Sequence, residues 1–166
     1  EQFLAAVESL AFFESDIKTL INRGMEYIPK DCRLAECFGV VIREFESGAD
    51  WESARRAVLN RFGHPDFTNS VQNMGIILIA LLYGGEDMRK TINIALRCGY
   101  DTDCTCASAA SVVGIISGYN ALGELKSLIN DYFICGIDVK RPSDSIKRLA
   151  EDCCTAAMNT PNSLLC

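Results

Sequence analysis

The stretch from Val71 to Tyr83 constrains the fold of this chain more than any other part of the sequence. Its residues are apolar on nearly every side of a helix, and Gly84-Gly85 ends it. A helix that lacks a polar face has to be buried, and the run from Met74 to Tyr83 is about half as long as a membrane span requires. We therefore expect this helix at the centre of a bundle, with other helices packed around it.

Amphipathic patterns on both sides of this stretch predict the surrounding helices. Apolar residues recur at helical spacing in segments 2–13, 16–28, 32–47, 51–61, 86–97, 104–116, 124–131 and 143–158. Capping residues precede several of them, namely Ser15, Asp31, Asp50 and, for the last helix, Ser143 or Asp144. No segment alternates with the period of two that is typical of a strand. The prediction is a single all-α domain over residues 1–166.

The charge of the chain limits the kinds of partner that we expect, and its cysteines indicate the compartment. The chain has 22 acidic and 16 basic residues, and the basic residues form no stripe, which argues against nucleic acid as the main partner. Nine cysteines occur without a Cys-x-x-Cys pair and with one histidine, His64, so we expect no zinc site of ordinary spacing. We interpret the cysteines as reduced thiols. Since no signal peptide or membrane-spanning run is present, we expect a cytoplasmic protein without a membrane partner.

The chemistry of the chain is concentrated in the segment from Gly99 to Asp103, which precedes a run of small residues. The carboxylates of Asp101 and Asp103 are two residues apart, and Gly99 permits a sharp backbone turn that aims both at one point. Such oxygen ligands suit a hard cation, Mg²⁺ or Mn²⁺. The alternative is structural, because acidic side chains at a helix N-terminus also cap the helix and interact favourably with its dipole.

A larger unit surrounds this acidic segment. It begins at Asn73-Met74-Gly75, continues through Leu82-Tyr83-Gly84 and the acidic segment, and ends in a small-residue helix with Gly114 and Gly118. This unit resembles the C-terminal half of the ADP-ribosylglycohydrolase family, which includes the dinitrogenase-reductase-activating glycohydrolases. Segments 3–6 (Phe-Leu-Ala-Ala) and 27–31 (Tyr-Ile-Pro-Lys-Asp) are also similar to the family, so the resemblance covers residues 1–150.

The resemblance implies a compact orthogonal multi-helix bundle and a hydrolase with a pair of divalent metal ions. Such an enzyme would remove ADP-ribose from modified protein side chains or related ADP-ribosyl compounds. By position, Asp101 and Asp103 match two metal-binding carboxylates of the family. The next position usually carries a threonine hydroxyl, but here it is Cys104, with Thr105 one residue further on. A neutral thiol is a poor ligand for Mg²⁺, so the site would lose that ligand or use water instead.

Other residues are candidates for positions near the metal or the substrate, and each has a competing structural role. These candidates are Thr102, Cys104, Thr105, Asn73 and Gly99. Gly99 can serve only the turn, Asn73 can form a helix-terminal hydrogen bond, and Thr102 can be a structural hydroxyl. Trp51 can stack on an adenine or pack in the core. No residue is assigned as a catalytic acid, base or nucleophile.

The family's other metal-binding carboxylates and its Gly-Asp motif belong to a half that would precede Glu1, and no Thr-Asp-Asp occurs in this chain. Because the chain begins without methionine and enters a helical pattern at once, we expect a fragment that holds half of an active site and is inactive alone. It would associate with the missing N-terminal half or form a homodimer. The alternative is a non-catalytic member that binds ADP-ribose or a nucleotide, or that is structural like the lens crystallin relatives.

Overall fold

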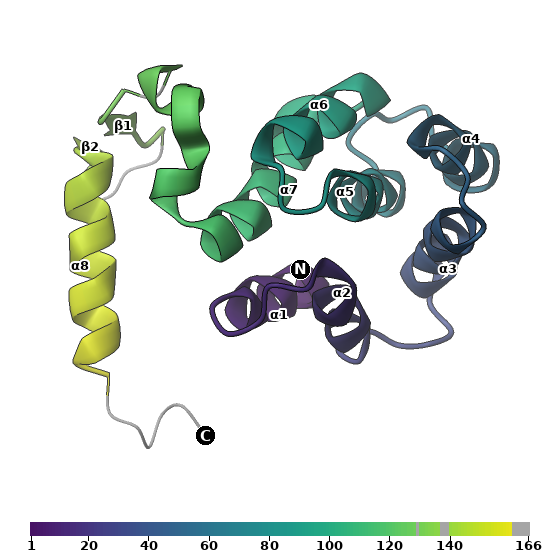
Figure 1. Ribbon diagram of the computed structural model, residues 1–166, viewed down its shortest axis with the longest axis horizontal. Helices are drawn as coiled ribbons and strands as arrows, with labels where there is room; N and C mark the ends of the chain where they lie inside the picture. The colour runs from purple at the N-terminus through teal and green to yellow at the C-terminus, as the bar shows by residue number, and fades with distance from the viewer. Residues whose placement is uncertain (129, 137–139, 161–166) are drawn as a thin grey trace. The chain divides into compact units, whose positions relative to one another are not determined.

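The computed structural model describes residues 1–128, 130–136 and 140–160, and the chain divides into two compact units, residues 1–122 and 123–166. The first unit is built of helices (Figure 1). They are α1 (Gln2–Ala11), α2 (Ile17–Met25), α3 (Arg33–Glu46), α4 (Trp51–Phe62), α5 (Ser70–Gly84), α6 (Met88–Cys98) and α7 (Thr102–Ser117). This architecture confirms the all-α fold class. Among the described residues, no helix has the length and apolar character that crossing a membrane requires.

Helix α5 lies at the centre of the first unit. It packs against α2, α3, α4, α6 and α7, which surround it in Figure 1. Every residue from Ile76 to Leu81 is buried. Each fully buried isoleucine or leucine side chain stabilises the fold by about 1.5–3 kcal/mol, so this helix anchors the core. The prediction of a central, fully covered helix is confirmed.

A close approach between α5 and α6 fixes the position of the helix that leads into the acidic segment. A Cβ atom on Gly84 would lie 2.6 Å from the Cα atom of Thr91, so only glycine fits there. Thr91 is fully buried, and its hydroxyl donates to the carbonyl of Gly85 at 3.3 Å. A larger residue at position 84 would push the two helices apart, which typically costs about 1–3 kcal/mol or more.

The caps predicted for α2, α3 and α4 agree with the structure to within one residue. Asp50 caps α4 as predicted. Asp16, not Ser15, caps α2, and Cys32, not Asp31, caps α3. Both corrections have one reason, which is that the capping atom belongs to the extended residue directly before the first helical one.

The second unit differs from the prediction. The 3₁₀ helix η1 (Tyr119–Leu128) is interrupted at Gly123, where a helix over 124–131 was expected. Strands β1 (Phe133–Ile134) and β2 (Ser143–Asp144) form an antiparallel pair, too short to show alternation in the sequence. Helix α8 (Ile146–Met158) consequently begins after Ser145, not after Ser143 or Asp144, and none of its residues is buried. The single domain over 1–166 stays a prediction, and residues 129, 137–139 and 161–166 of it lie outside the described part.

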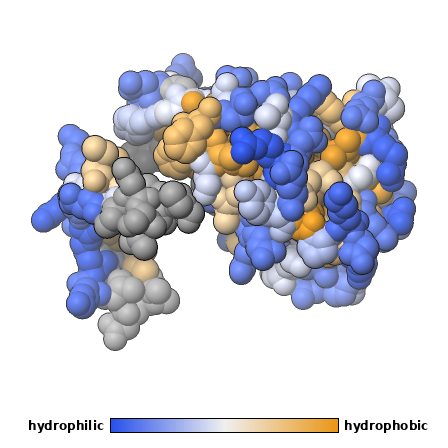
Figure 2. All heavy atoms as spheres, turned by 90° about the horizontal axis from the view of Figure 1, so that it is seen from below, coloured by the Kyte–Doolittle hydropathy of each residue, from blue (hydrophilic) through white to orange (hydrophobic). Residues whose placement is uncertain are grey.

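The surface seen in Figure 2 is largely hydrophilic, with small hydrophobic patches. In the first unit this follows from the amphipathic helices, whose apolar faces form one buried core. Fully buried examples from separate helices are Phe3, Phe38, Val58 and Leu78. The core therefore joins α1, α3, α4 and α5 and provides a fixed frame for the turn between α6 and α7.

Candidate metal centre

The acidic segment forms the turn between α6 and α7. Gly99 ends α6 with a φ of +78°, and Tyr100 follows with a φ of +65°. Tyr100 is the only non-glycine residue in the described part of the chain with a positive φ. Glycine adopts this conformation freely, whereas an L side chain in it costs roughly 1–2 kcal/mol. Helix α7 begins at Thr102, two residues earlier than predicted, so Asp103 lies in its first turn.

Asn73 supports this turn from the start of α5. Its side chain is buried, its Oδ1 atom accepts the backbone amide of Asp101 at 3.5 Å, and its Nδ2 atom donates to the carbonyl of Phe67 at 2.7 Å. The neighbouring Gln72 is fully buried and accepts the backbone amide of His64 at 2.8 Å. Two adjacent amide side chains thus fix the segment before α5, and Asn73 links it to the acidic turn.

Arg55 of α4 supports the same turn from another side. Its Nε atom donates to the carbonyl of Cys98 at 2.7 Å, and its guanidinium lies 6.0 Å from the ring centroid of Tyr100. A cation at this distance from an aromatic face is attracted to it. Burial raises the pKa of the Cys98 thiol to about 12, so this thiol is neutral and acts as an apolar side chain. Arg55 of α4, through these two contacts, holds the strained backbone at Tyr100.

The Asp101 carboxylate is not used as a helix cap, although Asp101 is the N-cap residue of α7. Its oxygens lie close to two other side chains. One ligand atom each from Asp101, Asp103 and Cys104 lies within 4.8 Å of the others. Asp103 and Cys104 are exposed and Asp101 is half-buried. The structure therefore brings three of the predicted residues into one open cluster.

The donor set of this cluster fits a hard cation in part. Two carboxylates are the ligands that Mg²⁺ and Mn²⁺ prefer. The thiol of Cys104 hydrogen-bonds to Asp101, and this bond, followed by the negative charges of Asp101 and Asp103, raises the thiol pKa. A thiol that stays protonated at neutral pH does not provide the thiolate that binds metals. The carboxylates suit a hard cation, and Cys104 does not.

The two threonines of the segment are engaged in the backbone of the first turn of α7. Thr105 is fully buried, and its hydroxyl donates to the carbonyl of Thr102 at 3.4 Å. The backbone amide of Thr102 donates to the carbonyl of Tyr100 at 3.0 Å. The bond of Thr105 is typical of a structural hydroxyl near a helix start, whereas Thr102 contributes its backbone amide. Gly99 likewise provides the turn, because its positive φ ends α6.

Sequence reasoning missed two residues that position the site, Gln72 and Arg55. Gln72 carried a signal, because it is a polar residue beside Asn73 at the start of an otherwise apolar helix. Arg55 carried none, since 43 residues separate it from the carbonyl that it binds. Trp51 is half-buried and packs against the core, and the guanidinium of Arg97 lies 5.1 Å from its ring centroid.

The structure is thus an all-α bundle with paired carboxylates at the start of α7. Residues 1–162 match the family model described as ADP-ribosylglycohydrolase, and the chain belongs to this family. No curated protein and no solved structure gives a significant match. The family is generally metal-dependent, and membership supports a glycohydrolase that acts on ADP-ribosyl compounds.

Proposed function

We propose that this protein is part of a metal-dependent hydrolase that removes ADP-ribose from modified protein side chains or related compounds. Asp101 and Asp103 hold a divalent cation, Mg²⁺ or Mn²⁺. The observation that carries the proposal is that the Asp101 carboxylate makes no capping bond, while its oxygens lie within 4.8 Å of ligand atoms of Asp103 and Cys104. If Asp101 capped α7 with its side chain, its carboxylate would accept a backbone amide of the first turn.

The residues of this chain would act by holding and orienting. A divalent cation at such a site supplies Lewis-acid polarisation of the substrate and activation of water. Asp101 and Asp103 bind it through carboxylate oxygens at the positive end of the α7 dipole, which also favours negative charge there. Asn73 fixes the backbone of Asp101, and Arg55 fixes the residue before it through the Tyr100 ring. Both supports are on helices of the core, so the carboxylates keep their positions.

The site in this chain is incomplete. One Mg²⁺ ion can be bound by one or two carboxylates with water completing its shell, but a pair of ions needs more carboxylates than Asp101 and Asp103. Within the described residues, the cluster around Asp101 is the single group of three acidic, cysteine or histidine side chains close enough to hold an ion. We therefore propose that the remaining acidic ligands belong to the other half of the family domain. On its own, this segment would have little hydrolytic activity.

The test is hydrolysis of an ADP-ribosylated protein by the intact enzyme with Mg²⁺ at saturation. Asp101→Ala should lower the rate by about a hundredfold or more, because the cation loses a direct ligand. Asp50→Ala is the matched control, since Asp50 is also an N-cap aspartate but lies at the start of α4. An Asp101→Ala enzyme with the normal rate and normal circular dichroism would contradict the assignment.

The neutral thiol of Cys104 favours a second candidate, a member that binds ADP-ribosyl groups without hydrolysing them. Calorimetry with ADP-ribose and Mg²⁺ separates the hydrolase from the binding protein, because a binding protein would bind ADP-ribose tightly and show no turnover. Cys104→Thr, which restores a hydroxyl, should then strengthen Mg²⁺ binding in either case. An increase in hydrolysis in that variant would favour the enzyme over the binding protein.

A further inference from the structure

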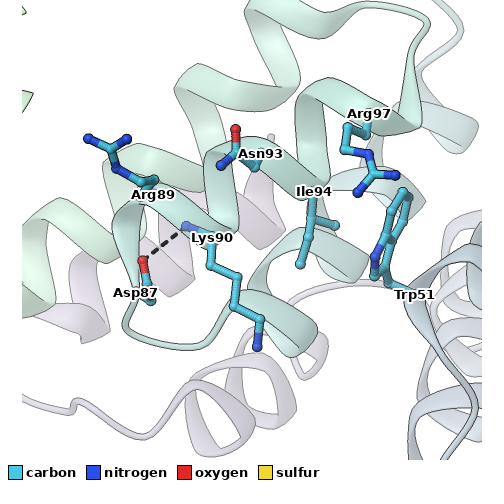
Figure 3. Close-up of a pocket in the computed structure, with 7 residues that line it drawn as sticks. All are labelled: Trp51, Asp87, Arg89, Lys90, Asn93, Ile94 and Arg97. Atoms are coloured by element: carbon cyan, nitrogen blue, oxygen red, sulfur yellow. Dashed lines mark hydrogen bonds between the residues drawn. The ribbon is translucent and has the colours of Figure 1, made fainter.

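A groove of about 380 Å³ lies along α6 and the start of α4, and its lining includes none of Asp101, Asp103 and Cys104. Figure 3 shows Ile94 between Lys90 and Trp51, with the guanidinium of Arg97 extending over the indole. Ile94 is 5% exposed and forms an apolar floor. Lys90 and Arg97 are seven residues apart, which is about two helical turns, so both lie on the same face of α6.

The groove concentrates positive charge on a chain whose net charge is −6. Arg89, Lys90 and Arg97 line it, together with one acidic residue, Asp87. Asp87 is the N-cap of α6, and its carboxylate accepts the backbone amide of Lys90 at 2.9 Å. Arg89 and Lys90 occupy the first turn of α6, where the helix dipole disfavours cations. The dipole of α6 therefore does not account for Lys90 at this position, which is consistent with a role at the surface.

The spacing of the cations is compatible with an extended ligand. Positions 90 and 97 are about 10.5 Å apart along the helix axis. A peptide in the polyproline II conformation rises about 3.1 Å per residue with three residues per turn, so side chains three residues apart share a face at a spacing of about 9 Å. The long side chains of Lys90 and Arg97 cover the small difference. Two carboxylates at this spacing would each meet one cation.

We infer that this groove binds an extended acidic segment of a partner protein, with acidic residues at positions i and i+3 facing Lys90 and Arg97. Figure 3 shows Arg89 and Lys90 extending in different directions from the first turn of α6, and Arg97 lies in its last turn, so the three charges do not converge on one point. Separated carboxylates match this distribution, whereas a compact phosphate group needs converging donors. The inference is independent of the proposed hydrolase activity.

The chain itself provides the reporter for a binding experiment. Trp51 is the only tryptophan of the chain and lines the groove, so tryptophan emission, separated from that of the tyrosines by selective excitation, reports on this surface. The probe is the peptide acetyl-Glu-Pro-Pro-Glu-amide, which polyproline II geometry holds at the required spacing. We expect a saturable change in Trp51 emission that weakens as salt is added, because exposed charges are screened. Acetyl-Gln-Pro-Pro-Gln-amide is the uncharged control and should not bind.

Variants of the groove should move the affinity in opposite directions. Lys90→Gln and Arg97→Gln should each weaken binding of the glutamate peptide about two- to fivefold, as expected for exposed charge pairs. Asp87→Asn should strengthen binding, because it removes a repulsive charge and asparagine still caps the helix. Lys30→Gln, at an exposed lysine outside the groove, is the matched control and should leave the affinity unchanged. Since Arg97 lies over the indole, calorimetry measures the Arg97→Gln affinity.

Three results with the peptides would overturn the inference. They are no binding of the glutamate peptide, equal binding of the glutamine peptide, and unchanged affinity in both Lys90→Gln and Arg97→Gln. Inorganic pyrophosphate that displaces the peptide at a lower concentration than the peptide needs to bind would also overturn it, in favour of a phosphate site. Thermal unfolding of each variant by circular dichroism checks that the fold is intact.

Discussion

The starts of α4 and α7 carry the same residue at the N-cap and use it differently. Asp50 has an extended backbone (φ −74°, ψ 164°), and its carboxylate accepts the amide of Ser53 at 2.7 Å. Asp101 has a ψ of 69°, follows two residues with positive φ, and makes no capping bond with its side chain. The first helix start is stabilised by its own cap. The second is supported by side chains from α4 and α5.

This difference explains how a carboxylate becomes available as a ligand. An N-cap aspartate normally gives its oxygens to amides of the first turn. At α7 the backbone is held from outside, by Asn73 and Arg55, so the turn does not depend on the Asp101 side chain. Asn73 and Arg55 thus stabilise the turn, which leaves the Asp101 carboxylate available for the metal binding that we propose.

The largest effect on stability should follow removal of the external support. Asn73→Ala deletes the 2.7 Å bond to the Phe67 carbonyl and leaves buried polar groups without a partner, so it should lower the free energy of unfolding by about 1–3 kcal/mol. Urea denaturation measures this change. Asn93→Ala, at an exposed position of α6, is the control and should change stability by less than about 0.5 kcal/mol. Equal stabilities of the two variants would mean that Asn73 does not support the turn.

The next effect, on metal affinity, should distinguish Asp101 from Asp50. In the intact protein, Asp101→Asn should weaken Mn²⁺ binding about tenfold or more, because a neutral amide replaces a carboxylate ligand. Asp50→Asn should leave Mn²⁺ binding unchanged, since Asp50 bonds to its own helix. Isothermal titration calorimetry provides both affinities. A similar loss in both variants would remove the distinction between the two helix starts.

A smaller effect should come from the strain at Tyr100. Tyr100→Gly removes an L side chain from a positive φ, a gain of roughly 1–2 kcal/mol, and adds the entropy cost of glycine, about 0.5–1 kcal/mol. We expect a net stabilisation of up to about 1 kcal/mol, reduced by the lost contact with Arg55. Tyr27→Gly, at an exposed tyrosine without positive φ, should instead destabilise the protein. Thermal unfolding of both variants tests this contrast.

The smallest effect should be on the stability of the protein at acidic pH. Hydrogen bonds from Ser53 lower the pKa of Asp50, so its stabilising contribution is present above the unfolded-state pKa of about 3.9 and is lost as the pH falls through the lower folded value. Asp50→Asn should therefore lose less stability on acidification below about pH 4 than the wild type. Chemical denaturation at a series of pH values measures it. Parallel acid profiles of the two proteins would show that this cap is not stabilised by its charge.

The parts of the fold that were predictable depend on local pattern. The apolar character of residues 71–83 indicated a central helix because burial on all sides follows from composition alone. Cap positions were less certain because neighbouring residues such as Ser15 and Asp16 have equivalent capping groups, and backbone geometry selects one. The strands β1 and β2 contain two residues each, which is too few for a periodic signal.

The contacts of the site that could not be predicted join residues that are far apart in the sequence. Asp101 and Asp103 were found because they are adjacent to each other in a short motif. Asn73 contacts the turn across 28 residues, and Arg55 does so across 43. Such contacts are set by how α4, α5 and α6 pack, which a single sequence does not specify. The sequence thus predicted the candidate ligands and missed how they are held.

The interruption of η1 at Gly123 separates two parts of the chain that differ in how many buried residues they contain. All the buried hydrophobic residues in the described part of the chain precede position 114, and the residues described after position 122 include no buried one. A protease or a shifted stop codon acting near this exposed glycine would spare the entire core, the acidic turn and the α6 groove. Substitutions in the described part of segment 123–166 accordingly remove no buried side chain.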